Sequence, residues 1–157
     1  MKRPAKQITK REIAAIHAFN ARAFGKQAPE VPKARAPSRD LEHKEQCAVI
    51  DYWRSAHKTF GLPEFALFAI PNGGHRHMLT AVRLKAEGVR KGIPDLMLAT
   101  ARGNWHGMYI EMKSVDGDVG PEQTEVLTYL YLEKYNARVA WGAQEAIQFI
   151  QDYLRGE

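Results

Sequence analysis

The spacing of apolar residues in the first part of the chain predicts a short helix and a linker. In residues 8–24, "ITKREIAAIHAFNARAF", apolar side chains recur every three or four positions, and Thr9 with Glu12 forms a capping-box pattern. Residues 25–40, "GKQAPEVPKARAPSRD", hold three prolines and no large apolar cluster. We therefore expect an N-terminal helical arm followed by an extended linker.

From residue 41 onward the pattern is that of a folded domain. Residues 41–60 place Val49 and Trp53 on one side of a helix that ends at Gly61. Beyond it, short apolar runs alternate with segments of helical period, and glycine or proline stands between them. The expected strands are 65–71, 94–100, 107–114 and 137–142, and the expected further helices are 75–88, 121–135 and 143–154.

This order of elements predicts an α/β fold, with a small mixed sheet covered by helices. The run "FALFAIP" at 65–71 is almost wholly apolar, and we expect a buried strand there. Six residues, "ARGNWH", join the strands at 94–100 and 107–114, which we expect to form an antiparallel hairpin.

Charge divides the chain into the same two parts. Residues 1–40 carry ten Lys/Arg and three Asp/Glu, whereas residues 41–157 carry thirteen basic and fifteen acidic residues. The basic arm indicates attraction to nucleic acid or another polyanion, and a solvated tail without a partner is the alternative that charge alone leaves open. We expect a basic arm over 1–40 and one folded domain over 41–157.

Several classes of protein are excluded by composition. The longest apolar run, "FALFAI", is far too short to cross a membrane, and the charged start does not resemble a secretion signal. The single cysteine, Cys47, can form neither an internal disulfide nor a cysteine zinc site, which fits a reducing compartment.

The strand "GMYIEMKS" at 107–114 carries the candidate chemistry. Its alternation places Glu111 and Lys113 on one face, and the hairpin would bring Asp95 close to Glu111. Two neighbouring carboxylates repel each other unless a divalent cation lies between them, and Mg²⁺ is commonly held by carboxylates, water and substrate phosphate. Taken alone, however, Glu111 and Lys113 fit a solvated pair on an edge strand better than a site.

Two further residues bear on this interpretation. Glu45 lies four and eight positions before Val49 and Trp53, on their helical stripe, where a carboxylate is costly unless it has a partner. It also fits an exposed first turn of the helix, which favours acids. Gln123, in the first turn of the helix after the strand, could reach back to the carboxylates or lie on the surface.

The segment "PNGGHRH" allows a different site. His75 and His77 with Asn72 could bind a metal, but they are two apart at a helix start and too few for zinc. Gly73 and Gly74 fit better a sharp turn or a close approach to phosphate.

Two groups of side chains could contact DNA. Trp105 and His106 lie at the predicted hairpin tip, where they could wedge a branched duplex or pack; we favour packing. The basic side chains after the glycine turn would contact phosphates or form a solvated helix face. They are Arg76, Arg83, Lys85, Arg90 and Lys91.

Taken together, these motifs resemble the PD-(D/E)xK nuclease superfamily and, within it, the VRR-NUC (virus-type replication–repair nuclease) family. "AIPNGG", "LKAEGVRKGIPDL", "YIEMK" and the "PEQ" of "GPEQ" are similar to the small stand-alone phage and bacterial members. The resemblance covers about residues 42–155. The residues that carry it are Pro94-Asp95, Glu111 with Lys113, Glu45-Gln46 and Gln123.

The resemblance implies a restriction-endonuclease-like core, with a mixed central sheet flanked by helices, and a Mg²⁺ or Mn²⁺ cofactor. Asp95, Glu111 and the main-chain carbonyl of Met112 would be metal ligands. Glu45 would complete the acidic cluster directly or through water, and Glu42, one turn earlier, is the alternative helix ligand.

The resemblance also implies a catalytic role for Lys113 and a supporting one for Gln123. The glycine turn and its neighbours would bind DNA: Asn72, Gly73, Gly74, Arg76, Lys85, Arg90 and Lys91. We expect an endonuclease selective for branched DNA, such as four-way junctions or flaps, in repair or recombination. It would act as a homodimer in the cytoplasm of a bacterium or phage-infected cell. A sequence-specific restriction-type enzyme and a non-catalytic DNA-binding module are the alternatives.

Overall fold

The computed structural model describes residues 39–71 and 83–156. The chain divides into two compact units, Met1–Ala34 and Arg35–Glu157, and every described element belongs to the second. The helix expected at 8–24 lies outside the described residues, as do most of the linker and most of the helix expected at 75–88.

The described unit combines helices with one four-stranded sheet. Its helices are α2 (Arg39–Ala56), α4 (Pro121–Leu132) and α5 (Ala143–Arg155), with 3-10 turns η1 (His57–Phe60) and η2 (Glu64–Ala66). Its strands are β1 (Leu67–Ala69), β2 (Leu96–Leu98), β3 (Met108–Lys113) and β4 (Asn136–Trp141).

The sheet is mixed, as the sequence predicts. Its strand order is β1-β2-β3-β4; β2 is antiparallel to both β1 and β3, and β4 is parallel to β3. The parallel pair is joined by α4, because parallel neighbours need a crossover connection. The expected hairpin is present as β2 and β3, and its connection contains a bridge between Arg102 and Trp105.

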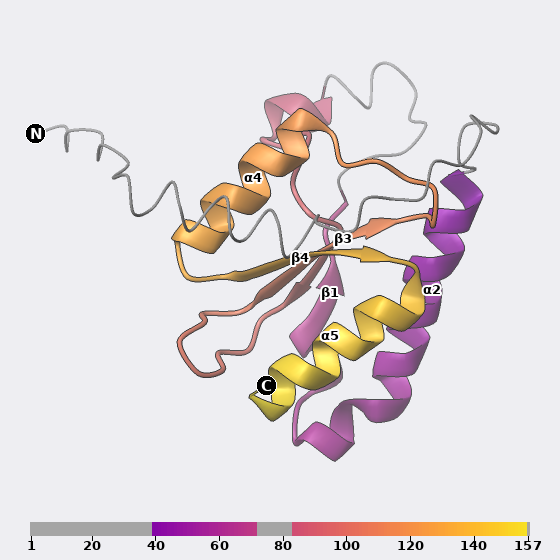
Figure 1. The fold of residues 1–157 in the computed structure, drawn as a ribbon, viewed down its shortest axis with the longest axis vertical. Coiled ribbons are helices and arrows are strands. Elements are labelled where there is room, and N and C mark those ends of the chain that lie inside the picture. Colours follow the sequence, from indigo (N-terminus) through magenta and orange to yellow (C-terminus); the bar gives the residue numbers. More distant parts are fainter. Residues whose placement is uncertain (1–38, 72–82, 157) are drawn as a thin grey trace, which may run out of the picture. The chain divides into compact units, whose positions relative to one another are not determined.

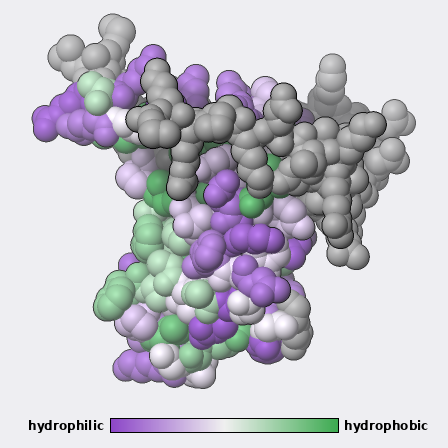
Figure 2. All heavy atoms as spheres, turned by 90° about the vertical axis from the view of Figure 1, so that its left-hand side faces the viewer, coloured by the Kyte–Doolittle hydropathy of each residue, from purple (hydrophilic) through white to green (hydrophobic). Residues whose placement is uncertain are grey.

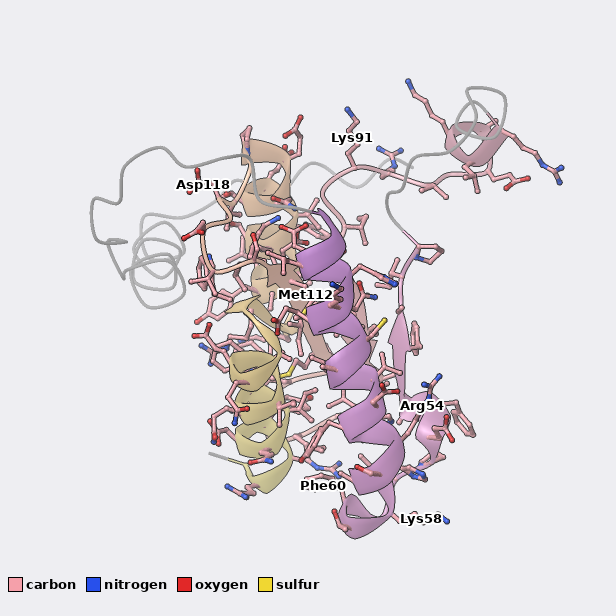
Figure 3. The ribbon with its side chains drawn as sticks, turned by 90° about the vertical axis from the view of Figure 1, so that its right-hand side faces the viewer. Arg54, Lys58, Phe60, Lys91, Met112 and Asp118 are labelled. Carbon is pink, nitrogen blue, oxygen red and sulfur yellow. The ribbon has the colours of Figure 1, made fainter. Side chains whose placement is uncertain are left out.

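The helices cover both faces of the sheet. Figure 1 shows α4 on one side of the sheet and α2 with α5 on the other. Met108, Ile110 and Met112 of β3 are buried in the core that includes Val49 and Trp53 of α2. This agrees with Figure 3, in which Met112 lies behind α2.

The strand β3 is buried on its second face as well. Glu111 is 3% exposed and Lys113 is 7% exposed, although the sequence also allowed a solvated edge pair for them. Because β3 is a central strand between two layers of helices, both sets of alternating side chains lose contact with solvent. The solvated-pair alternative is therefore wrong for these two residues.

The strand expected at 65–71 is shorter and more exposed than predicted. Residues 64–66 form a 3-10 turn, and Phe65 is 80% exposed and Phe68 44% exposed. Within the described sheet β1 is an edge strand paired with β2 alone, so much of it remains open. An apolar run does not reveal whether a strand has one neighbour or two.

On the face drawn in Figure 2, hydrophilic and hydrophobic residues are interspersed, as on most water-exposed protein surfaces. Within the part of the chain that the structure describes, no helix has the length and apolar character needed to span a membrane.

Candidate active site

The β2–β3 pairing brings two acidic residues together. Leu96 pairs with Ile110, so Asp95 lies directly before the start of β2, opposite Glu111 in the same register. Residues opposite each other in an antiparallel pair share a face of the sheet. The N–H of Met112 donates a 2.8 Å hydrogen bond to Oδ2 of Asp95, which holds this carboxylate at the end of the hairpin.

Lys113 and Gln123 converge on one oxygen of Glu111. Lys113 Nζ lies 2.9 Å from Oε1 of Glu111, and the side-chain amide of Gln123 donates to the same oxygen. The second oxygen, Oε2, is buried and has no hydrogen-bond partner among the described residues. One half of the carboxylate is thus fixed, and the other half remains available for a ligand.

The loop before α4 positions Gln123. Its Oε1 accepts a 2.8 Å hydrogen bond from the N–H of Gly120, so the amide is held at both ends. Nearby, Gly92 adopts φ 82, and a Cβ there would lie 2.7 Å from the carbonyl oxygen of Glu122. A glycine is therefore required for the segment before Asp95 to pass this close to the start of α4.

Glu45 lies where its helical stripe predicts, but its carboxylate serves α5. Its Oε2 accepts a 2.6 Å hydrogen bond from the N–H of Ala143, the first residue of that helix. The N-terminus of a helix favours negative charge, which explains how a carboxylate is accommodated in line with Val49. The preceding Gly142 donates its N–H to the carbonyl of Lys113 at 2.9 Å. Glu45 therefore contacts the helix start that is bonded to the β3 backbone.

Glu42 is the helix acid that faces the carboxylate pair. Its charge raises the pKa of both Asp95 and Glu111, and its Oε1 lies 3.5 Å from the backbone nitrogen of Ser114. The sequence placed Glu42 and Glu45 one helical turn apart and left the choice between them open. In the structure, the charge of Glu42 acts on the carboxylate pair, whereas Glu45 binds the start of α5.

Burial raises the pKa of both acids, and the charge of Asp95 adds to this effect at Glu111. Burial raises the pKa of Asp95, and the hydrogen bond from Met112 and the charge of Lys113 oppose this. Burial and the charge of Asp95 raise the pKa of Glu111 to about 7, although Lys113 acts in the opposite direction. The single ammonium does not fully compensate for the acids gathered around it.

These features fit a divalent cation. Glu111 Oε2 is a buried oxygen without a partner among the described residues, and Asp95 lies opposite Glu111 with a pKa raised by burial. In residues 39–71 and 83–156, however, no three His, Cys, Asp or Glu side chains form a group that could alone hold a metal. This fits Mg²⁺, which takes one or two carboxylates and completes its shell with water and substrate phosphate.

Sequence reasoning did not identify Ser114. It directly follows Lys113, and its hydroxyl oxygen is buried with no partner in the described part of the chain. The alternation of β3 placed Ser114 on the core face, and nothing in the sequence marked its hydroxyl as unpaired.

The predicted DNA-binding residues are only partly described. Asn72, Gly73, Gly74 and Arg76 lie outside the described residues. Lys85, Arg90 and Lys91 are exposed, and Figure 3 shows Lys91 near the end of the unit where α2 begins.

Comparison with known proteins identifies the family. The family model described as "VRR-NUC domain" matches residues 32–144. A solved structure named "VRR_NUC domain protein" is 30% identical, with a TM-score of 0.63, and the match covers 74% of this chain and 89% of that one. Among curated proteins nothing matches.

Proposed function

Because the chain belongs to the VRR-NUC family, nucleases of the PD-(D/E)xK type, we propose that it is a divalent-metal-dependent DNA endonuclease. The observation that supports this most directly is the meeting of Asp95, Glu111 and Lys113 at one end of the hairpin, where Glu111 keeps a second buried oxygen without a partner among the described residues. The intact site favours this proposal over a non-catalytic DNA-binding module.

Asp95 and Glu111 would hold Mg²⁺ or Mn²⁺ with the Met112 carbonyl as a further ligand, and Glu42 would add negative charge near them. The bound ion would act as a Lewis acid toward the scissile phosphate and lower the pKa of a bound water. The chain's own groups would do the remaining work. The Gln123 amide keeps Glu111 in one orientation, so its free oxygen faces the site.

Lys113 would supply positive charge where the reaction develops negative charge. Its ammonium lies beside Glu111 and is 7% exposed, so water screens it little. There it could donate a hydrogen bond to the attacking water or to a phosphate oxygen. In the absence of substrate it neutralises part of the acidic cluster.

Substitution of Lys113 tests the mechanism. In Lys113→Ala and the bulkier Lys113→Met, we expect cleavage with Mg²⁺ or Mn²⁺ to fall on the order of 10²- to 10³-fold. DNA binding measured in EDTA should persist in both variants. Lys58→Ala, which removes an exposed lysine from η1, should cleave like wild type. Undiminished cleavage in both Lys113 variants would refute the mechanism.

We further propose that the shape of branched DNA, rather than its sequence, selects the substrate. The described residues contain no zinc finger or other base-reading module, whereas a symmetric dimer would make two equivalent cuts at a junction. Cleavage of junctions and flaps should exceed cleavage of linear duplexes of matched length. Cutting at one sequence in every linear duplex would favour the restriction-type alternative.

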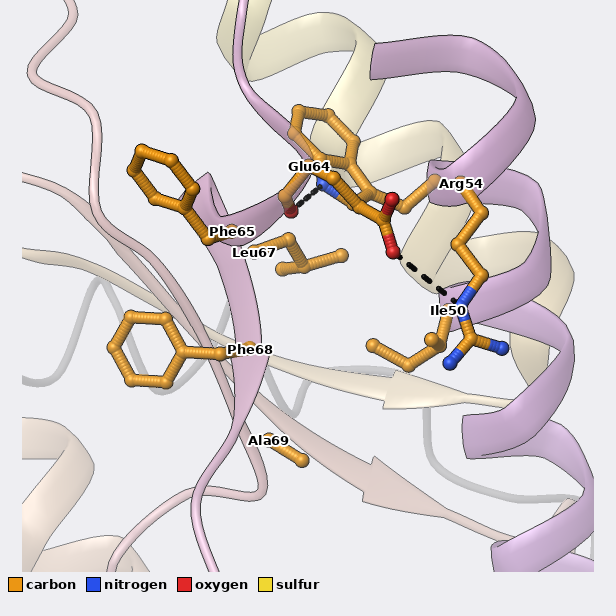
Figure 4. Close-up of a pocket in the computed structure, with 8 residues that line it drawn as sticks. Ile50, Arg54, Glu64, Phe65, Leu67, Phe68 and Ala69 are labelled. Carbon is orange, nitrogen blue, oxygen red and sulfur yellow. Dashed lines mark hydrogen bonds and ion pairs between the residues drawn. The ribbon is translucent and has the colours of Figure 1, made fainter.

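The edge strand β1 of the described sheet supports a homodimer. Figure 4 shows Phe65 and Phe68 pointing away from α2, beside a depression of about 480 Å³ between β1 and α2. Arg54 and Glu64 lie on this surface 3.6 Å apart. A patch with both charges can complement itself across a two-fold axis, and an edge strand can pair with its own copy. We therefore propose a second copy of the chain as the occupant of this edge.

A further inference from the structure

A second polar pocket lies at the other end of β3. It has a volume of about 320 Å³ and is formed by the β2–β3 connection together with the ends of α4 and α5. We call it the hairpin pocket. Its principal lining residues are Arg102, Asn104, Trp105, Tyr131, Lys134 and Tyr153. Two cations and three aromatic residues therefore line it, and no Asp or Glu among the described residues does.

Lys134 stands in this pocket in an unusual backbone conformation. Its φ is 66, and it is the only non-glycine residue in the described part of the chain with positive φ. It follows Glu133, the C-cap of α4, at the position where helices commonly place glycine. A cation near a helix C-terminus interacts favourably with the helix dipole. A lysine within the last turn of α4 would have the same interaction without a left-handed backbone. A strained residue at a pocket is a reason to look for function.

The aromatic wall of the pocket is held in place. The Trp105 and Tyr131 rings lie 5.4 Å apart between centroids, at an angle of 46°. Two backbone hydrogen bonds of 2.9 and 3.1 Å join Trp105 to Arg102 across the turn. Gly103, at φ 54, occupies the first central position of this turn. The half-buried indole is thus fixed beside two positive charges.

The position of the pocket suits a DNA strand that continues from the candidate active site. Asn136 lines the pocket and pairs with Met108, three residues before Glu111 in β3. At about 3.3 Å per residue, Met108 lies roughly 10 Å from Glu111 along β3, and the connection that carries Trp105 lies beyond Met108. Figure 1 shows the β2–β3 connection at the opposite end of the sheet from the start of α2.

We propose that the hairpin pocket binds one unpaired nucleotide of the DNA substrate, an inference that rests on the proposed nuclease function. The indole of Trp105 would stack on the base, and Lys134 with Arg102 would contact a phosphate of the same strand. Stacking on an aromatic ring requires an unpaired base, and it combines well with a cationic track for the backbone. The pocket would therefore favour substrates with a single-stranded segment over fully paired duplexes.

Tryptophan fluorescence tests this in the full-length chain with EDTA present, so that no cleavage takes place. An oligo-dT of eight nucleotides should quench the tryptophan fluorescence, and a blunt duplex of eight base pairs should quench it much less. Trp105→Phe should lose the quenching while retaining affinity for labelled oligo-dT in fluorescence polarisation. If the quenching persists in Trp105→Phe, the proposal is wrong.

Substitution of Lys134 separates binding from folding. Lys134→Gly removes the ammonium and suits the left-handed backbone, so its melting temperature should not fall. Its affinity for oligo-dT should fall roughly three- to tenfold, and the salt slope should fall by about 0.7, as for one lost phosphate contact. Lys134→Arg keeps the charge and should bind like wild type. Equal binding by Lys134→Gly would overturn the assignment.

Two more comparisons complete the test. Free dTMP should compete far less well than oligo-dT, and equal competition would indicate a site for free nucleotides instead. Cleavage of branched DNA without fluorescence quenching would refute the pocket and leave the nuclease function standing. Quenching by oligo-dT without cleavage in any metal would support the pocket and refute the nuclease function.

Discussion

At the scale of single residues, the ionisation of Glu111 is the most informative property of the site. Its pKa is raised to about 7, first by burial and then by the charge of Asp95, from an ordinary value of 4.5. Between these pH values the folded protein holds a proton that the unfolded chain has lost. The free energy of unfolding of the metal-free protein should therefore decrease as pH rises from about 4.5 to about 7.

The Glu111→Gln variant should lack this part of the pH dependence. Relative to wild type, its free energy of unfolding should rise on the order of 2 kcal/mol between pH 5 and pH 8. Urea denaturation in EDTA at several pH values measures this difference. Glu122→Gln removes an exposed carboxylate from the first turn of α4, and its curve should run parallel to that of wild type. If the curve of Glu111→Gln also runs parallel to that of wild type, the Glu111 carboxyl of wild type titrates normally.

A divalent cation should stabilise the folded protein more at high pH than at low pH, because it binds the ionised carboxylates. With Mn²⁺ in excess, the increase in melting temperature should be larger at pH 8 than at pH 5.5. Asp95→Asn should lose most of this increase, and isothermal calorimetry should show weakened Mn²⁺ binding. Unchanged Mn²⁺ affinity in Asp95→Asn would remove that residue from the ligand set.

At the scale of elements, α2 contributes two acids with different partners. Glu45 accepts a hydrogen bond from the start of α5, so Glu45→Ala should lower the free energy of unfolding by about 1–2 kcal/mol. Glu42 instead faces Asp95 and Glu111, so Glu42→Ala should remove repulsion and leave stability equal or higher. Denaturation curves of both variants decide the assignment.

Cleavage activity should depend more on Glu42 than on Glu45, the opposite of the order for stability. Glu42→Ala should lose much more metal-dependent cleavage than Glu45→Ala when both are assayed well below their melting temperatures. Equal losses of cleavage, with equal stabilities, would mean that the structure does not distinguish the two acids.

The sequence predicted those elements whose period is strong and failed where a tertiary neighbour decides the outcome. The stripe through Val49 and Trp53 and the hairpin of β2 and β3 are both present, and the hairpin alone suffices to bring Asp95 to Glu111. The partner of Glu45 depends on where α5 begins in space, which spacing within α2 does not encode. The exposure of Phe68 likewise depends on what lies beside β1 in space.

At the scale of the whole molecule, the open edge of the described sheet decides between a monomer and a dimer. Phe65 and Phe68 are large apolar side chains at the edge strand of the described sheet, and their exposure to water is unfavourable unless another surface covers them. We expect wild type to dimerise with increasing concentration in sedimentation velocity. The double variant Phe65→Ser/Phe68→Ser should remain a monomer at the same concentrations.

Tyr129 provides the matched control for the loss of an exposed aromatic residue. It is 62% exposed on α4, the helix on the other face of the sheet from α2. Tyr129→Ser should therefore dimerise like wild type. A dimer should cut a four-way junction at two equivalent positions in one binding event. The Phe65→Ser/Phe68→Ser monomer should cut only one strand at a time, so a supercoiled plasmid with a cruciform should be nicked rather than linearised. A wild-type monomer at every concentration, or a dimer that survives the double substitution, would rule out this edge as the subunit contact.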